Sequence, residues 1–263
     1  EMTQKRTTTQ SAFLLGTCMK KLNKFLIKSG SLVVFLLTGV WPVFASNTGG
    51  VPAPAIKPYK KTMSYRAGYS PAENSNDEIY IHRIHFQQSF SETSRWRIIG
   101  QMRDVGSGNE YDELRIQYHK VVDTFFDFAD STAIRFDLRT RKGSRPEQAS
   151  LVWTNQWKFS PNLAVTGVLL GHWQFGGNAN PGTRMEVRYS AAYDLGDGAR
   201  VAVEGFSDLG DVSEQSGIDN QKHSLGIMYS TPTDWGRLHV GYLAGLSSPA
   251  PEHTLRLWWS YSV

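Results

Sequence analysis

Arginines recur at alternate positions in several segments of this chain, where acidic residues are scarce. A guanidinium group stays charged at physiological pH and donates two parallel hydrogen bonds to a carboxylate or a phosphate. Arginines spaced along one face would therefore favour the binding or passage of anions. The candidates for such an anion path are Arg95, Arg97, Arg103, Arg115, Arg135, Arg139, Arg141, Arg188 and Arg256.

Few acids share the positions of these arginines. The acids expected to pair with them are Glu113, Asp137, Glu186 and Glu204. The other acids are expected largely in loops: Asp77, Glu78, Asp104, Glu110, Asp112, Glu147, Asp208, Asp211, Glu214 and Asp219. Pairing would thus neutralise only part of the positive charge and leave a surplus of arginine.

The elements that carry these side chains have the period of a β-strand. In residues 133–141 (AIRFDLRTR), isoleucine, phenylalanine and leucine alternate with charged side chains. Successive side chains of a strand point to opposite faces, so this pattern predicts one apolar face and one polar face. The pattern is nearly continuous after residue 61, and helical periodicity is scarce.

The turn signals divide the chain into about twelve predicted strands. They cover 61–70, 79–90, 95–105, 111–122, 131–141, 149–159, 163–175, 183–194, 199–207, 222–230, 236–246 and 253–263. Most are long enough to cross a bilayer at a tilt, which takes about 9–11 residues. Tight turns follow most even strands, longer loops follow the odd strands, and the strand count is even. Together these features predict a closed antiparallel transmembrane β-barrel.

The last predicted strand supports this fold. In residues 255–263 (LRLWWSYSV), apolar side chains occupy alternate positions up to the terminal Val263. This segment resembles the C-terminal strand of Gram-negative outer-membrane barrels of the porin-like superfamily, although a terminal Phe is usual there. The resemblance implies insertion by the barrel-assembly machinery through strand 255–263. It also implies contact with outer-membrane lipid and lipopolysaccharide.

A soluble β-sandwich also alternates in polarity, but its strands are usually shorter. Here the apolar face carries many aromatic residues, including Trp96, Trp153 and Tyr261, and many of them lie toward strand ends. Aromatic rings at strand ends are typical of the two interfaces of a lipid bilayer. The lipid-facing interpretation is therefore preferred.

If the apolar face meets lipid, the arginines line the lumen. The chain then resembles, in strand number, size and basic lumen, the small monomeric twelve-stranded channels that pass acidic oligosaccharides. We expect a monomeric passive channel for small anionic or polar solutes. Two alternatives stay open: a non-conducting structural, assembly or polysaccharide-export barrel with paired lumenal charges, and an outer-membrane hydrolase.

The first 45 residues are expected to be an upstream extension and a Sec signal peptide. A basic segment (19–28) precedes an apolar run (32–44) too short to span a bilayer, and Val43-Phe44-Ala45 suits a signal peptidase. This leader holds the single cysteine, Cys18, and six of the 28 Lys and Arg residues. The remainder has 22 basic and 23 acidic residues, which argues against nucleic-acid binding and fits export to the outer membrane.

Residues 46–60 are expected to form a flexible periplasmic lead, although this Pro- and Gly-rich stretch could instead fold into the lumen as a plug. No cofactor or metal is expected. His82 and His85 are three positions apart and therefore point to opposite faces of a strand. Histidines and serines that share the lumenal face lack a nucleophile motif such as G-x-S-x-G, so an enzyme is not expected.

Overall fold

A computed structural model of the chain describes residues 48–72, 78–104, 108–123, 128–213 and 221–263. The proposed upstream extension and signal peptide (1–45) lie outside the described residues. None of the described segments forms a helix that is long and apolar enough to span a membrane.

The strands lie close to the predicted ranges. They are β1 (Lys61–Ser70), β2 (Ile79–Ser89), β3 (Ser94–Asp104), β4 (Glu110–Val122), β5 (Ser131–Arg141), β6 (Glu147–Lys158), β7 (Leu163–Phe175), β8 (Thr183–Gly196), β9 (Ala199–Asp211), β10 (His223–Thr233), β11 (Gly236–Gly245) and β12 (His253–Ser262). The clearest differences are at β9, which extends to Asp211 and not 207, and at β10, which extends to Thr233 and not 230.

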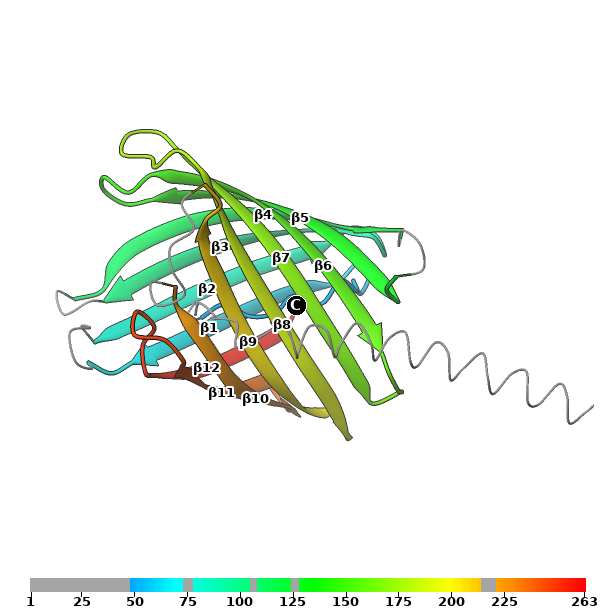
Figure 1. The fold of residues 1–263 in the computed structure, drawn as a ribbon. Helices are drawn as coiled ribbons and strands as arrows, with labels where there is room; N and C mark the ends of the chain where they lie inside the picture. Colours follow the sequence, from blue (N-terminus) through cyan, green and yellow to red (C-terminus); the bar gives the residue numbers. More distant parts are fainter. Residues whose placement is uncertain (1–47, 73–77, 105–107, 124–127, 214–220) are drawn as a thin grey trace, which may run out of the picture. The chain divides into compact units, whose positions relative to one another are not determined.

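Each strand pairs with its sequence neighbours, and β12 pairs with β1 (Figure 1). All pairings are antiparallel, so the fold is a closed twelve-strand antiparallel β-barrel, as predicted. Closure pairs Tyr65 with Trp259 and Ala67 with Leu257. A closed barrel leaves no strand edge unpaired, which is the condition for a sheet to cross lipid.

The two faces of the wall differ as the alternation predicts. In β5, Phe136 and Leu138 are 55% and 60% exposed, whereas Arg135 and Asp137 are 7% and 4% exposed. Since the large apolar side chains face outward, they cannot form a core for a soluble sandwich. The charged side chains are enclosed within the barrel.

Two of the three register shifts among the described strand pairs explain where the simple alternation fails on the lumenal face. One lies between Gln101 and Met102 on the β3–β4 pair, and it brings the adjacent residues Asp112 and Glu113 both into buried positions. The other lies between Met185 and Glu186 on the β8–β9 pair, beside Gly210, whose φ is +76°. A bulge with glycine in the left-handed region lets β9 continue through Asp208 to Asp211, where a loop was expected.

The interior also contains apolar side chains at lumenal positions. Phe206 and Leu243 form one buried cluster, and Ala192, Ala202, Met228 and Trp258 form another. Val152, Val168 and Leu170 form a third cluster, on β6 and β7. The lumen therefore combines an arginine network with an apolar surface, and is not uniformly polar.

Residues 48–54 lie inside the barrel and not outside it. Thr48 is fully buried, and Val51 packs against both the Phe206–Leu243 cluster and the cluster on β6 and β7. Over these residues the structure differs from the flexible lead expected for 46–60 and matches the alternative, a segment folded into the lumen. We call residues 48–54 the N-terminal strap.

Candidate functional site

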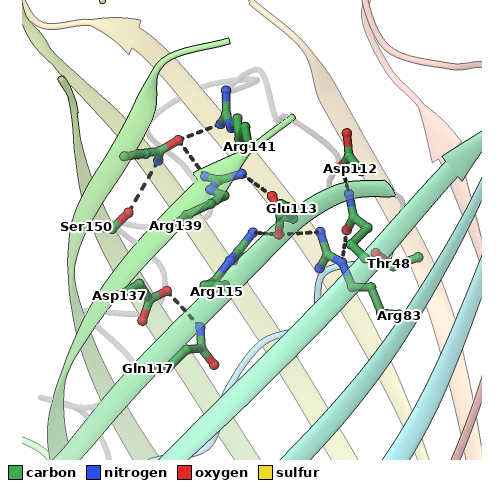
Figure 2. A network of polar contacts seen from close by, with 12 residues as sticks. Thr48, Arg83, Asp112, Glu113, Arg115, Gln117, Asp137, Arg139, Arg141 and Ser150 are labelled. Atoms are coloured by element: carbon green, nitrogen blue, oxygen red, sulfur yellow. Dashed lines mark hydrogen bonds and ion pairs between the residues drawn. The ribbon is translucent and has the colours of Figure 1, made fainter. Parts of the chain in front are cut away.

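The centre of the lumenal network is Glu113 on β4, which is 2% exposed. Its Oε1 lies 2.5 Å from Nη2 of Arg115 and 3.9 Å from Nη2 of Arg83, and its Oε2 lies 2.9 Å from Nη1 of Arg139. Figure 2 shows these side chains converging from neighbouring strands. Arg115 and Arg139 are directly opposite in the β4–β5 pairing. Like charges so placed repel, and the carboxylate between them offsets that repulsion.

Glutamines extend this network on both sides. Gln148 Oε1 accepts hydrogen bonds from Arg139 Nη2 at 2.6 Å and from Arg141 Nη2 at 2.7 Å. On the other side, Arg83 donates to Gln101, which in turn donates to Asp112. Charge patterning alone does not predict a role for these glutamines, although they lie on the same lumenal face as the arginines.

A second group lies on β3, β4 and β5. Arg135 donates to both carboxylate oxygens of Asp137, at 2.7 and 2.9 Å, and Gln117 donates to Asp137 at 2.8 Å. Next to this pair is a small pocket that contains three guanidinium groups. Its lining is Arg95, Trp96, Arg97, Gln117, His119 and Arg135. Because Asp137 is bound to Arg135, the pocket keeps an excess of positive charge.

Two of the ion pairs on β8 to β12 involve acids predicted to lie in the lumen. Arg188 binds Glu186 through two hydrogen bonds of 2.7 and 2.9 Å, and Arg256 Nη2 lies 2.7 Å from Glu204. The four acids predicted to pair with lumenal arginines thus all do so. Arg256, whose side chain is fully buried, also lies over the rings of Phe206 and Trp258.

The strap accepts hydrogen bonds from the same arginines. Arg256 Nη1 donates to the Gly49 carbonyl at 2.8 Å, and Arg188 Nη1 donates to the Gly50 carbonyl at 3.1 Å. Arg66, which stacks 4.1 Å over the Trp258 ring, donates to the Thr48 carbonyl at 3.5 Å. Backbone carbonyls of the strap therefore accept hydrogen bonds from arginine N–H groups that are not bonded to lumenal acids.

Several arginines have only neutral partners among their described contacts. Arg97 donates to Gln87 and Gln117, and Arg141 donates to Gln148. Arg95 contacts the Ala53 carbonyl and His119. Arg103, at the end of β3, has a buried Nε without a hydrogen-bond partner among the described residues. Positive charge therefore exceeds negative charge in the described part of the lumen.

Six acids expected in loops lie instead within strands: Asp104, Glu110, Asp112, Glu147, Asp208 and Asp211. Two of them pair with arginines. Asp112 on β4 is buried and lies 2.5 Å from Arg145, and Asp208 on β9 lies 3.0 Å from Arg184. The register shifts described above place them there. No pattern in the sequence marks a bulge at these positions, so the alternation alone could not find these pairs.

A serine, a histidine and an acid lie in sequence on β6, β7 and β8. Ser150 Oγ is 2.8 Å from Nδ1 of His172, and Nε2 of His172 is 3.4 Å from Oε2 of Glu186. However, Arg188 binds both oxygens of Glu186, and the Gln148 amide lies 2.5 Å from the same Nδ1. We interpret these residues as a link in the lumenal network. Among the described residues, no cluster of His, Cys, Asp or Glu could hold a metal ion.

Comparison with known proteins supports the fold. No protein-family model matches the chain, and no curated protein matches it in sequence. Among solved structures, the barrel is similar to the COG4313 outer membrane channel from Pseudomonas putida F1, with a TM-score of 0.58, 10% identity and coverage of 84% of this chain and 100% of that chain.

Two porins are also similar. The KdgM porin has a TM-score of 0.55 at 12% identity, over 77% of this chain and 99% of that chain. The NanC porin has a TM-score of 0.55 at 11% identity, over 76% of this chain and 100% of that chain. This chain therefore has a porin-like barrel fold of the kind found in outer-membrane channels.

Proposed function

We propose that the protein is a monomeric outer-membrane barrel that acts as a narrow passive channel for small anionic or polar solutes. In this proposal, lumenal arginines set a preference for anions. The observation that carries it is the set of arginines, including Arg97 and Arg141, whose described partners are neutral oxygens. A guanidinium without a carboxylate partner retains its full attraction for a passing anion.

The location and the non-enzymatic role have separate support. The exposed apolar side chains form the outer face of a closed barrel, and such a face needs lipid around it. The similar solved structures are channels of the outer membrane, and none of the three is named as an enzyme. The last strand, β12, closes the barrel, which fits the proposed role of 255–263 in assembly.

Single-channel recording in planar bilayers tests the proposed selectivity. With a salt gradient across the bilayer, the wild-type protein should give a reversal potential of the sign expected for anion preference. The double variant R97Q/R141Q should move that potential toward zero, because it removes two lumenal charges that form no ion pair with a described acid. Cation preference of the wild-type protein would overturn the proposal.

A matched control is K57Q/K142Q, which removes two positive charges from exposed side chains. Its reversal potential should stay close to that of the wild-type protein, because solvent screens exposed charges. An equal shift in both double variants would mean that net charge, and not the lumen, sets the selectivity.

The second candidate function is a non-conducting structural or assembly barrel. It is favoured by the ion pairs around Glu113 and by the strap, which bonds to arginines and packs on apolar clusters inside the barrel. The two functions differ in one outcome. A non-conducting barrel stays silent in bilayers both with the strap and without it, whereas the proposed channel conducts at least when the strap is absent.

The hydrolase alternative has one supporting contact, between Ser150 and His172. It predicts that the wild-type protein hydrolyses an ester substrate and that the Ser150→Ala variant does not. We expect no such activity. The Gln148 amide contacts His172, the base that a hydrolase would use, and Arg188 binds Glu186, the acid that would orient it.

A further inference from the structure

The strap is attached to the barrel almost entirely through its backbone carbonyl groups. Besides the bonds to Thr48, Gly49 and Gly50, Arg95 donates to the Ala53 carbonyl at 3.4 Å, and His119 Nε2 lies 3.0 Å from the Pro54 carbonyl. The five basic side chains come from β1, β3, β4, β8 and β12. The strap is thus held from several sides of the lumen.

The composition of the strap suits this position. It contains no charged side chain, and Pro52 and Pro54 have no backbone N–H that could compete for acceptors. Gly50 allows close approach, since a Cβ there would lie 2.7 Å from the Trp258 ring. Val51 is its one bulky apolar residue, and it packs on apolar clusters from β6 and β7 and from β9 and β11. A small, neutral, acceptor-rich segment therefore fills the space between the arginines.

The bonds that hold the strap are weaker than those an anion could make. A hydrogen bond between a charged donor and a charged acceptor is roughly twice as strong as a neutral one, and a carboxylate accepts from both arms of a guanidinium. Two of the five bonds are long: Arg66 donates to the Thr48 carbonyl at 3.5 Å, and Arg95 donates to the Ala53 carbonyl at 3.4 Å. These two arginines also have no acidic partner among the described contacts.

We propose that the strap is a displaceable plug, and that solutes bearing carboxylate groups release it by taking Arg66 and Arg95 from the strap carbonyls. This inference deepens the channel proposed above, because it names the solute class and the element that controls entry. Chloride is a weaker competitor, since it cannot accept two parallel hydrogen bonds in the geometry of a carboxylate.

Thiol labelling tests the plug without any current measurement. In a C18S background, which removes the chain's one cysteine, V51C places a thiol on the strap where it packs against the wall. A maleimide–polyethylene glycol reagent should label V51C slowly in folded protein in sodium chloride, and severalfold faster in citrate of the same ionic strength. The control K57C lies in an exposed part of the same segment and should label rapidly in both salts.

The outcomes separate the two proposals. Equal V51C labelling rates in chloride and citrate would overturn release by carboxylates, and rapid labelling at V51C in chloride would overturn the plug itself. If citrate accelerates labelling while bilayers bathed in citrate stay silent, the strap proposal stands and the channel proposal fails. Labelling of urea-unfolded V51C gives the rate for a fully accessible thiol.

Discussion

The two sides of the barrel interior neutralise their arginines in different ways. On β2 to β6, which we call the polar wall, Arg83, Arg115 and Arg139 are bound by side chains, with Glu113 at the centre. On β8 to β12 together with β1, which we call the strap wall, arginines use acids, aromatic rings and strap carbonyls. The ion pairs around Glu113 need no contact with the strap, although Arg95 and His119 on the same wall also bond to strap carbonyls. On the strap wall, by contrast, Arg66, Arg188 and Arg256 all bond to the strap.

This difference suggests that one wall stabilises the barrel and the other controls passage through it. A buried carboxylate shared by three guanidiniums is costly to break, because its loss leaves like charges facing one another. A neutral strap is cheaper to displace, since the arginines beneath it can bind water or anions in its place. We therefore assign structural support to the polar wall and regulation to the strap wall.

The largest expected effect is on the polar wall. Glu113→Gln removes the charge that the three arginines share, and should lower the free energy of unfolding by about 3–5 kcal/mol. Urea titration of the protein in detergent or vesicles measures this loss.

The control for that variant is Glu110→Gln. Glu110 pairs with Lys142 at 3.1 Å, with both side chains more than half exposed. Exposed pairs contribute about 0–1 kcal/mol, so this variant should unfold close to the wild-type protein. If Glu113→Gln is as stable as Glu110→Gln, the polar wall is not the structural support that we describe.

A smaller effect is expected on the strap wall. Gly50→Ala places a methyl group 2.7 Å from Trp258, whose ring contacts Arg66 and Arg256. The resulting overlap should cost about 1–3 kcal/mol and displace the strap. We expect a larger single-channel conductance, with little change in the urea midpoint because the barrel itself stays folded.

Gly100→Ala is the matched control, because a Cβ at Gly100 meets no atom within 4 Å. Its conductance and stability should match those of the wild-type protein to within about 0.5 kcal/mol. Should Gly50→Ala also leave conductance unchanged, the close approach at Trp258 has no part in holding the strap.

Period-two alternation was enough to predict most of the barrel. The range predicted for β5, 131–141, matches the structure, and the outward exposure of Phe136 and Leu138 follows directly from their spacing. The alternation also predicted pairing with arginines for four acids, because it places their side chains on the same face as the arginines. These acids are Glu113, Asp137, Glu186 and Glu204. Their proposed roles in an anion path remain predictions.

The strap and the apolar lumen were harder to predict. Gly49 and Gly50 bond to Arg256 and Arg188, which lie 207 and 138 residues away, and no local pattern reports such contacts. The alternation does place Phe206 and Leu243 on the lumenal face. Their role in packing, however, depends on contact with Val51, a residue far away in the sequence. Long-range packing of an aperiodic segment is therefore the part of the site that spacing could not supply.

The most direct test of the account is the bilayer conductance of a variant that lacks residues 48–54. Without the strap, the arginines of the strap wall face open water, and the account predicts larger, anion-preferring currents than the wild-type protein gives. Equal currents from both proteins would contradict the strap as the controlling element. Silence from both would contradict the channel.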